Sequence, residues 1–256
     1  MAPLIAFIIG AGQNVGEHTA AALKAKGYQV AVGSRKPDIE QRKKEGYFPV
    51  VIDATNPDSV KTAFAQVNKE LGPPNVVIFN ASHWVSAAVP EDPLTLSLEG
   101  LKEQMDVTLA AYAAAQEALQ GFRSETHKDG LKTFIITGNP LPWVPADTLP
   151  LYFGVYIQKT ILWRFTEFFA NAYAKEQARF YFVTLVGKAG GVIDDLSHWP
   201  TSGPQHAQVQ YSYVFHWDHA VNDLLPSLQV YLDLITREDQ TDWDYRFTVD
   251  GKKWTK

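Results

Sequence analysis

The chain has 256 residues, 46% hydrophobic and 20% charged, which is enough for one globular domain with a substantial core. It contains no cysteine, which excludes disulfides, thiolate catalysis and cysteine-ligated metals and is compatible with a reducing, cytoplasmic location. A net charge of −5 without a lysine or arginine block argues against a nucleic-acid partner, and no apolar run approaches the ~18 residues of a membrane span.

The first expected element is a buried strand at residues 4–9, followed by a glycine turn and a helix at residues 17–26. Gly10 and Gly12 permit a tight turn with close backbone approach, and Gly16 lets the helix pack on the strand. Free N–H groups and the dipole at the helix start favour anionic oxygens. The pattern predicts a dinucleotide pyrophosphate site; the alternative is a glycine turn without a ligand.

Strands and helices alternate along the rest of the chain. Further strands are expected at residues 28–34, 48–54, 75–81, 132–137, 179–186 and 245–249. Further helices are expected at residues 57–71, after a capping Asn56, and at 98–122, 154–176 and 216–234. This alternation predicts one doubly wound, Rossmann-type α/β domain over residues 1–256, with helices on both faces of the sheet. Its seven strands are expected to be mostly parallel, in the spatial order 3-2-1-4-5-6-7.

Short motifs along the chain together resemble the short-chain dehydrogenase/reductase family. The glycine turn resembles the family's G-x-x-x-G-x-G motif, with Asn14 replacing the middle glycine. Asp53-Ala54 resembles its acidic residue beside adenine, and Asn80-Ala81-Ser82 resembles its Asn-Ala-Gly. The resemblance covers about residues 4–195 and implies an oxidoreductase that uses a nicotinamide dinucleotide. The cofactor-binding residues that it implies are Gly10, Gly12, Gln13, Asn14, Val15, Gly16, Ser34, Arg35, Asp53, Ala54, Asn80, Ala81, Ser82, Thr108, Thr137 and Lys159.

The end of the second strand decides which dinucleotide such an enzyme prefers. Family members that use NAD carry Asp or Glu there, whereas this chain has Ser34 and Arg35. Arg35 offers a planar fork for a 2′-phosphate and Ser34 adds a hydroxyl donor, which predicts NADPH/NADP+ as the cofactor. The alternative is that Arg35 and Lys36 form only a solvated, charged turn.

The family's catalytic Ser, Tyr, Lys and Asn are mostly absent. Lys159 fits the lysine position, but Val155 stands four residues earlier, where the tyrosine belongs. Thr108 replaces the asparagine, and Thr137-Gly138 stands where a serine is expected. The chain therefore resembles an atypical member that lacks the usual catalytic tyrosine, and in which Lys159 still binds the nicotinamide ribose.

Three hypotheses describe the chemistry that remains. In the first, Tyr156, Tyr152 or His83 supplies the proton for reduction of a carbonyl group. In the second, the substrate is an imine or iminium ion, which develops no oxyanion, and Asp147 or Asp194 steadies its charge. In the third, the chain is a non-redox NADP(H)-binding protein that acts as a sensor, a scaffold or a template for a cyclisation.

Aromatic residues gather in the segments expected around the substrate, which favours a bulky aromatic or polycyclic ligand. The resemblance places a substrate lid at about residues 187–217. The candidate substrate residues are Trp84, Trp143 and Trp199, and the segment around the lid adds Tyr211, Tyr213, Phe215 and Trp217. The alternative is that these side chains fill the core or a subunit interface.

The expected partners are a small-molecule substrate and further copies of the chain. The helices at residues 98–122 and 154–176 carry more apolar and small residues than covering one sheet face requires. The resemblance implies that they pair across a two-fold axis, which predicts a homodimer or homotetramer. No nucleic acid or membrane partner is expected, and the spacing of the seven histidines predicts no metal site.

Overall fold

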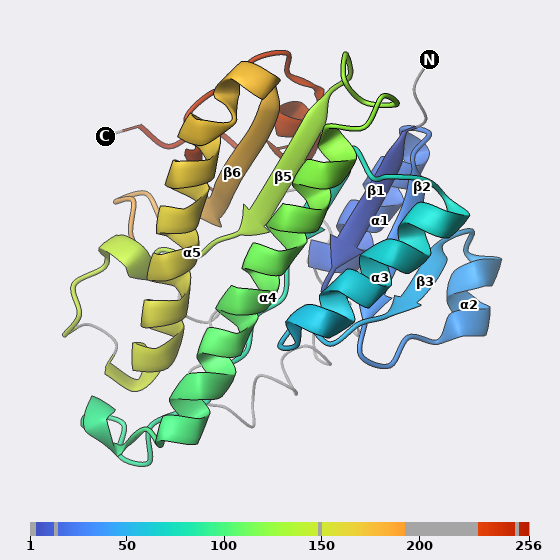
Figure 1. Ribbon diagram of the computed structural model, residues 1–256. Coiled ribbons are helices and arrows are strands. Elements are labelled where there is room, and N and C mark those ends of the chain that lie inside the picture. Colours follow the sequence, from blue (N-terminus) through green and yellow to red (C-terminus); the bar gives the residue numbers. More distant parts are fainter. Residues whose placement is uncertain (1–3, 13–14, 148–149, 193–229, 249–250, 256) are drawn as a thin grey trace, which may run out of the picture.

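The computed structural model describes residues 4–12, 15–147, 150–192, 230–248 and 251–255, and its centre is a seven-stranded sheet (Figure 1). The strands follow the order β3-β2-β1-β4-β5-β6-β7 and every neighbouring pair is parallel, which confirms the predicted order. The strands are β1 (Ile5–Ile9), β2 (Gln29–Ser34), β3 (Phe48–Val51), β4 (Val76–Phe79), β5 (Lys132–Thr137), β6 (Ala178–Leu185) and β7 (Asp244–Phe247).

Helices cover both faces of this sheet, so the predicted doubly wound α/β fold is confirmed. The helices are α1 (Val15–Ala25), α2 (Ile39–Lys44), α3 (Pro57–Glu70), α4 (Leu98–Phe122) and α5 (Phe153–Ala172), and residues 230–236 are also helical. In Figure 1, α3, α4 and α5 cross the nearer face. Helix α1 and the helical residues 230–236 pack on the other face. None of the helices in the described ranges has the length and apolar character needed to cross a membrane.

Strand β1 shows why the strands are continuous apolar runs. Its five residues are all fully buried. Phe7 packs in the core under α3 and α4, whereas Ile8 packs in the core under α1, because successive side chains point to opposite faces. A strand with both faces covered needs an apolar residue at every position.

The starts of α3 and α4 are fixed by capping residues, one of which was predicted from the sequence. The Asn56 side chain accepts hydrogen bonds from the backbone of residues 58 and 59, and Pro57 takes the first helical position. The Ser97 side chain accepts from the backbone N–H of Gly100 at the start of α4. Each cap stabilises its helix by about 1 kcal/mol.

A buried arginine ties the helical residues 230–236 to the amino-terminal edge of the sheet. Arg179, at the start of β6, is 1% exposed. Its guanidinium donates to the carbonyl groups of Leu234 and Ile235 at 3.3 and 3.0 Å and to that of Arg237, and to the Thr133 hydroxyl at 2.7 Å. These carbonyl groups end the helix, where the helix dipole favours a cation.

Candidate functional site

The turn between β1 and α1 is anchored to the strands on both sides of β1. The backbone N–H groups of Gly10 and Ala11 donate to the carbonyl of Gly33 in β2, at 3.0 and 2.9 Å. The side-chain amide of Asn80, just after β4, donates to the carbonyl of Gly10 at 2.9 Å. Since the carboxyl ends of parallel strands meet at one edge of a sheet, the turn lies at the edge where α/β proteins bind ligands.

The three glycines of this turn have different roles. Gly10 has a φ of +91°, and a Cβ there would lie 2.8 Å from the backbone nitrogen of Ala81. A Cβ on Gly16 would lie 2.6 Å from the Cα of Ala11, so α1 packs against the turn only with glycine at this position. A Cβ on Gly12 would meet no atom within 4 Å, so its backbone is open to a ligand. The turn therefore fits an extended pyrophosphate at the start of α1.

Replacing Gly16 by alanine should lower the free energy of unfolding by about 1–3 kcal/mol, because the added methyl group overpacks backbone atoms. The matched change Gly12→Ala should keep that free energy within about 0.5 kcal/mol of the wild type, because the methyl group enters open space. Urea denaturation measures both values. Equal stabilities of the two variants would contradict the packing role of Gly16.

Polar side chains stand at the carboxyl ends of β2 and β3. Ser34 ends β2, and the exposed side chain of Arg35 follows it. Asp53 follows β3, and its Oδ1 accepts hydrogen bonds from the backbone N–H and the hydroxyl of Thr55 at 3.0 and 2.8 Å. These bonds hold the pKa of Asp53 below its usual range, and the charge of the nearby Arg35 lowers it further. Arg35, Asp53 and the partly buried Ala54 are the residues at the predicted adenine side of the site.

The segment after β4 connects the glycine turn with α5. The backbone of Ala81 lies against Gly10, which is why that glycine has no room for a side chain. The Ser82 hydroxyl donates to the side-chain oxygen of Gln158 in α5 at 3.1 Å. Asn80, Ala81 and Ser82 thus follow the end of β4 beside the turn, and their role in cofactor binding stays a prediction.

Lys159 is a buried cation beside the end of β5. It is 5% exposed, and its Nζ donates to the carbonyl of Thr137 at 2.9 Å. Burial lowers the pKa of Lys159 to about 8. The hydroxyl of Thr137 lies 3.0 Å from that of Tyr231, whose pKa burial raises to about 12. Thr108 in α4 is also buried, and its hydroxyl has no hydrogen-bond partner within the described ranges. A buried ammonium fits ribose hydroxyl groups, which accept its hydrogen bonds.

The residues at the expected serine and tyrosine positions are closely packed. A Cβ on Gly138 would lie 2.2 Å from the Thr184 hydroxyl and 2.4 Å from the ring of Phe182, so a serine would have to displace one of them. Val155 is 7% exposed and belongs to an apolar cluster with Leu141. Neither Val155 nor Gly138 carries a hydroxyl group, whereas Thr137, next to Gly138, does.

The three alternative proton donors have contacts of their own. Tyr152 is 8% exposed and stacks on Trp84, with ring centroids 5.2 Å apart. The hydroxyl of Tyr156 lies 3.4 Å from the carbonyl group of residue 144. The Nε2 of His83 lies 2.9 Å from the carboxylate of Glu103 in α4. These contacts fix the three side chains in place. They do not test whether any of them donates a proton, so that role stays a prediction.

Trp143 links the loop after β5 to the segment after β6. Its indole N–H donates to the carbonyl of Gly190 at 2.9 Å, and the guanidinium of Arg246 in β7 lies 3.4 Å from a ring centroid of the indole. Asp147 is exposed in the same loop. Other predicted residues lie outside the described ranges: Gln13, Asn14, Asp194, Trp199, Tyr211, Tyr213, Phe215 and Trp217, with most of the predicted lid.

Sequence reasoning missed two fully buried amides, Gln104 in α4 and Gln158 in α5. Each glutamine stands among apolar residues at helical spacing, which places it on the buried face of its helix. That position could have indicated a structural role, because a buried polar side chain needs hydrogen-bond partners. Within the described ranges, no group of three histidine, aspartate or glutamate side chains is placed to hold a metal ion.

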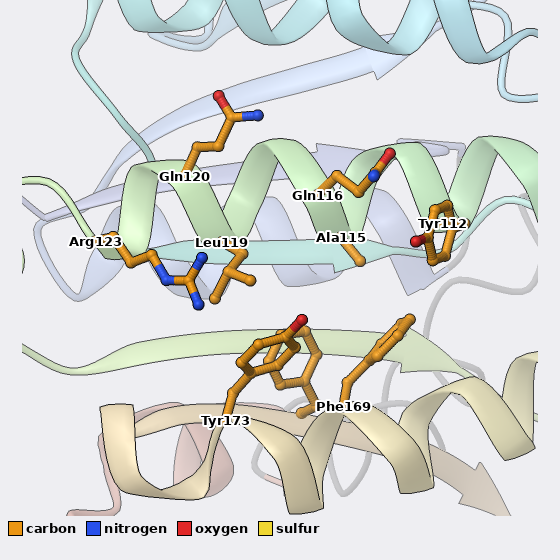
Figure 2. A pocket seen from close by; sticks show the side chains of 9 residues that line it. Tyr112, Ala115, Gln116, Leu119, Gln120, Arg123, Phe169 and Tyr173 are labelled. Atoms are coloured by element: carbon orange, nitrogen blue, oxygen red, sulfur yellow. The ribbon is translucent and has the colours of Figure 1, made fainter.

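A groove of about 240 Å³ lies between the C-terminal halves of α4 and α5 and is separate from this site (Figure 2). The lining residue Tyr112 is exposed, and the same two helices carry the exposed apolar residues Leu109 and Phe168. Figure 2 shows aromatic and polar side chains from α4 facing aromatic side chains from the end of α5. It is lined by Tyr112, Ala115, Gln116, Leu119, Gln120, Arg123, Phe169, Tyr173 and Phe180.

The similarity to known proteins is clearest in the N-terminal part of the chain. A family model of the short chain dehydrogenases matches residues 4–112. The short chain dehydrogenase/reductase dmxR12 of Cryptosporiopsis sp. (strain 8999) is 33% identical over 156 residues. That alignment covers 57% of this chain and 62% of the length of the relative. The family match includes the glycine turn and the Asp53 and Asn80 motifs.

Solved structures share the fold over most or all of the chain. The alcohol dehydrogenase from the archaeon Thermococcus sibiricus, complexed with 5-hydroxy-NADP, is 18% identical with a TM-score of 0.66 over 97% of each chain. The 3-ketoacyl-(acyl-carrier-protein) reductase from Brucella melitensis, complexed with NADH, is 18% identical with a TM-score of 0.60. That similarity covers 71% of this chain and 73% of the reductase.

Proposed function

Because the chain belongs to the short-chain dehydrogenase/reductase family, we propose that it is an NADPH-dependent reductase of a bulky aromatic or polycyclic substrate. One observation carries the proposal: an open glycine turn, an exposed Arg35 and a buried Lys159 stand together at the carboxyl edge of the sheet. A bound nicotinamide dinucleotide would supply a hydride at this edge.

The choice of NADPH rests on the residues after β2. Of the two similar structures described above, one is complexed with 5-hydroxy-NADP and the other with NADH. The fold itself therefore does not determine which dinucleotide is bound. Arg35 is exposed, its guanidinium can bind a 2′-phosphate with two hydrogen bonds, and Ser34 stands beside it. The Asp53 carboxylate is held by Thr55 in a local turn, where its negative charge partly balances that of Arg35 in the absence of a phosphate.

Replacing Arg35 by alanine should weaken NADPH binding by about 10- to 100-fold and leave NADH binding unchanged, because only NADPH loses charge-assisted hydrogen bonds. Lys26→Ala, which removes an exposed cation beyond the end of α1, is the matched control and should alter neither affinity. Fluorescence titration of the wild type and the two variants with both dinucleotides measures the six dissociation constants. Equal affinity of the wild type for NADPH and NADH would contradict the assignment.

The substrate class follows from the side chains that the site lacks. Reduction of a ketone develops negative charge on oxygen, and the usual family tyrosine and serine donate to it. Here Val155 stands at the tyrosine position and Thr137-Gly138 where the serine is expected. Gly138 has no room for a side chain, and the Thr137 hydroxyl lies 3.0 Å from that of Tyr231. An iminium ion takes up a hydride and becomes a neutral amine, so it needs neither donor. We therefore propose an iminium ion, or an imine that binds already protonated as the iminium, ahead of a carbonyl compound.

The partly exposed Trp84, stacked on Tyr152, supports the proposed aromatic substrate. The second candidate function is a non-redox NADP(H)-binding protein. The expected replacement of the family's tyrosine and serine favours it. NADPH consumption with ketones, quinones and cyclic imines separates the two, because a sensor, scaffold or cyclisation template binds the dinucleotide without consuming it.

The proposed quaternary structure is a homodimer or homotetramer. The groove between α4 and α5 (Figure 2), together with the exposed Leu109 and Phe168 on these helices, supports burial of this side against a second copy. Light scattering at micromolar concentration should give a dimer or tetramer mass, and a monomer mass would contradict this proposal.

A further inference from the structure

We infer that Gln158 is a positioning residue, whose buried amide fixes residues 82–85 and, through them, the turn that faces the dinucleotide. The inference rests on the proposed function, because that function gives the turn its ligand. Residues 82–85 belong to no helix or strand, yet they connect the end of β4 to the wall of the site. Their conformation therefore depends on side chains from neighbouring helices.

Gln158 binds three groups at once. Its side chain is 0% exposed, and its Oε1 accepts a hydrogen bond from the Ser82 hydroxyl at 3.1 Å. Its Nε2 donates to the carbonyl groups of Gln104 and His83, at 3.0 and 3.3 Å. A buried amide with these three partners joins α4, α5 and the segment after β4. Removing it leaves the carbonyl groups of Gln104 and His83 without this donor, and frees the exposed Ser82 from α5.

A second buried amide, that of Gln104, acts together with Gln158, and we call this pair of glutamines the clamp. Gln104 is also 0% exposed, and its Nε2 donates to the carbonyl of Val85 at 3.1 Å. A Cβ on Gly154 would lie 1.8 Å from this Nε2, so α5 admits the amide only because residue 154 is glycine. Two glutamines thus hold the carbonyl groups of residues 83 and 85, and Trp84 between them stacks on Tyr152.

The clamp lies between the glycine turn and Lys159, the parts of the proposed site assigned to the pyrophosphate and the nicotinamide ribose. Two residues before Ser82, Asn80 donates to the carbonyl of Gly10 in the glycine turn. The residue after Gln158 is Lys159, which donates to Thr137. Loss of the Gln158 amide would release the turn beside Gly10 and the wall that carries Trp84, while α5 itself could remain folded.

Gln158→Leu keeps the side-chain volume but removes every hydrogen bond, so NADPH binding should weaken by about 10- to 100-fold. Gln66→Leu, on the exposed face of α3, is the control and should bind NADPH as the wild type does. Energy transfer from tryptophan to NADPH measures affinity at a temperature where melting curves show all variants folded. Wild-type affinity in folded Gln158→Leu would overturn the inference.

Gln158→Glu separates positioning from packing. The ionised carboxylate accepts from Ser82 but repels the carbonyl groups of His83 and Gln104, whereas the protonated acid regains one donor. NADPH affinity of this variant should therefore recover toward the wild-type value as the pH is lowered, and Gln158→Leu should show no recovery. A merely structural role predicts the same pH profile for both variants.

A second readout tests the clamp even if the wild type binds no dinucleotide, an outcome that would reject the proposed function alone. The emission of Trp84 is obtained by subtracting the spectrum of Trp84→Phe, in the wild-type and the Gln158→Leu background. Acrylamide should quench Trp84 at least about two-fold more strongly in Gln158→Leu, because the segment loses its anchor. Unchanged quenching would overturn the inference independently of any ligand.

Discussion

Lys159→Met should bind NADPH about 10- to 100-fold more weakly than the wild type, because the ribose hydroxyl groups lose a charge-assisted donor. The melting temperature should not fall, because the change also removes a charge whose burial is unfavourable. Weaker binding without loss of stability distinguishes this role from misfolding. Lys175→Met, an exposed lysine after α5, is the matched control, and an equal loss of affinity there would contradict the role of Lys159.

The same residue predicts a pH dependence. Burial lowers the pKa of Lys159 from an ordinary 10.5 to about 8, so the unfolded chain binds one more proton than the folded chain between these values. The contribution of this group to stability is thus present above pH 10.5 and lost as the pH falls through 8, a difference of about 3 kcal/mol. Urea denaturation across this range should show the rise in the wild type and not in Lys159→Met.

Arg179→Met should destabilise the fold by about 3–5 kcal/mol, because it leaves the terminal carbonyl groups of the helical residues 230–236 buried without a donor. Arg164→Met removes an arginine whose side chain is 57% exposed and which pairs with Glu167 on the surface of α5. That control should cost less than about 1 kcal/mol.

Urea denaturation of the two variants measures the contrast, and Arg179→Lys should recover part of the loss, because an ammonium supplies up to three N–H donors in place of five. A loss below about 1 kcal/mol for Arg179→Met would contradict the anchoring role. The sequence offered no sign of this role, because the partners of Arg179 lie about 50 residues away in both directions along the chain.

The sheet and the long helices were predictable because local signals agree with the fold. The helix at residues 98–122 is observed with the predicted bounds, since Ser97 caps its start. The strand predicted at residues 48–54 ends at Val51 instead, because Asp53 and Thr55 form a local turn. Helix α2 was missed because all its residues except Ile39 are polar and none is buried, so no apolar periodicity marks it.

The candidate site was predictable where backbone conformation dictates the residue, as at Gly10 and Gly16. It was not predictable where contacts cross between elements. The clamp that Gln158 forms with Ser82 joins residues 76 positions apart, and the packing of Thr184 against Gly138 depends on the register of β5 and β6. Such contacts are set by tertiary packing, which no local pattern encodes.

Transfer of deuterium from 4-deuterated NADPH tests the central proposal most directly. The protein would be incubated with the labelled dinucleotide and either a polycyclic iminium ion or the corresponding ketone, and the products analysed by mass spectrometry. We predict deuterium in the amine formed from the iminium ion, and labelling of the alcohol slower by a factor of about 10²–10⁴, because Val155 and Gly138 supply no proton to an oxyanion. Equal labelling of both products, or tight binding of NADPH without any labelled product, would contradict the account.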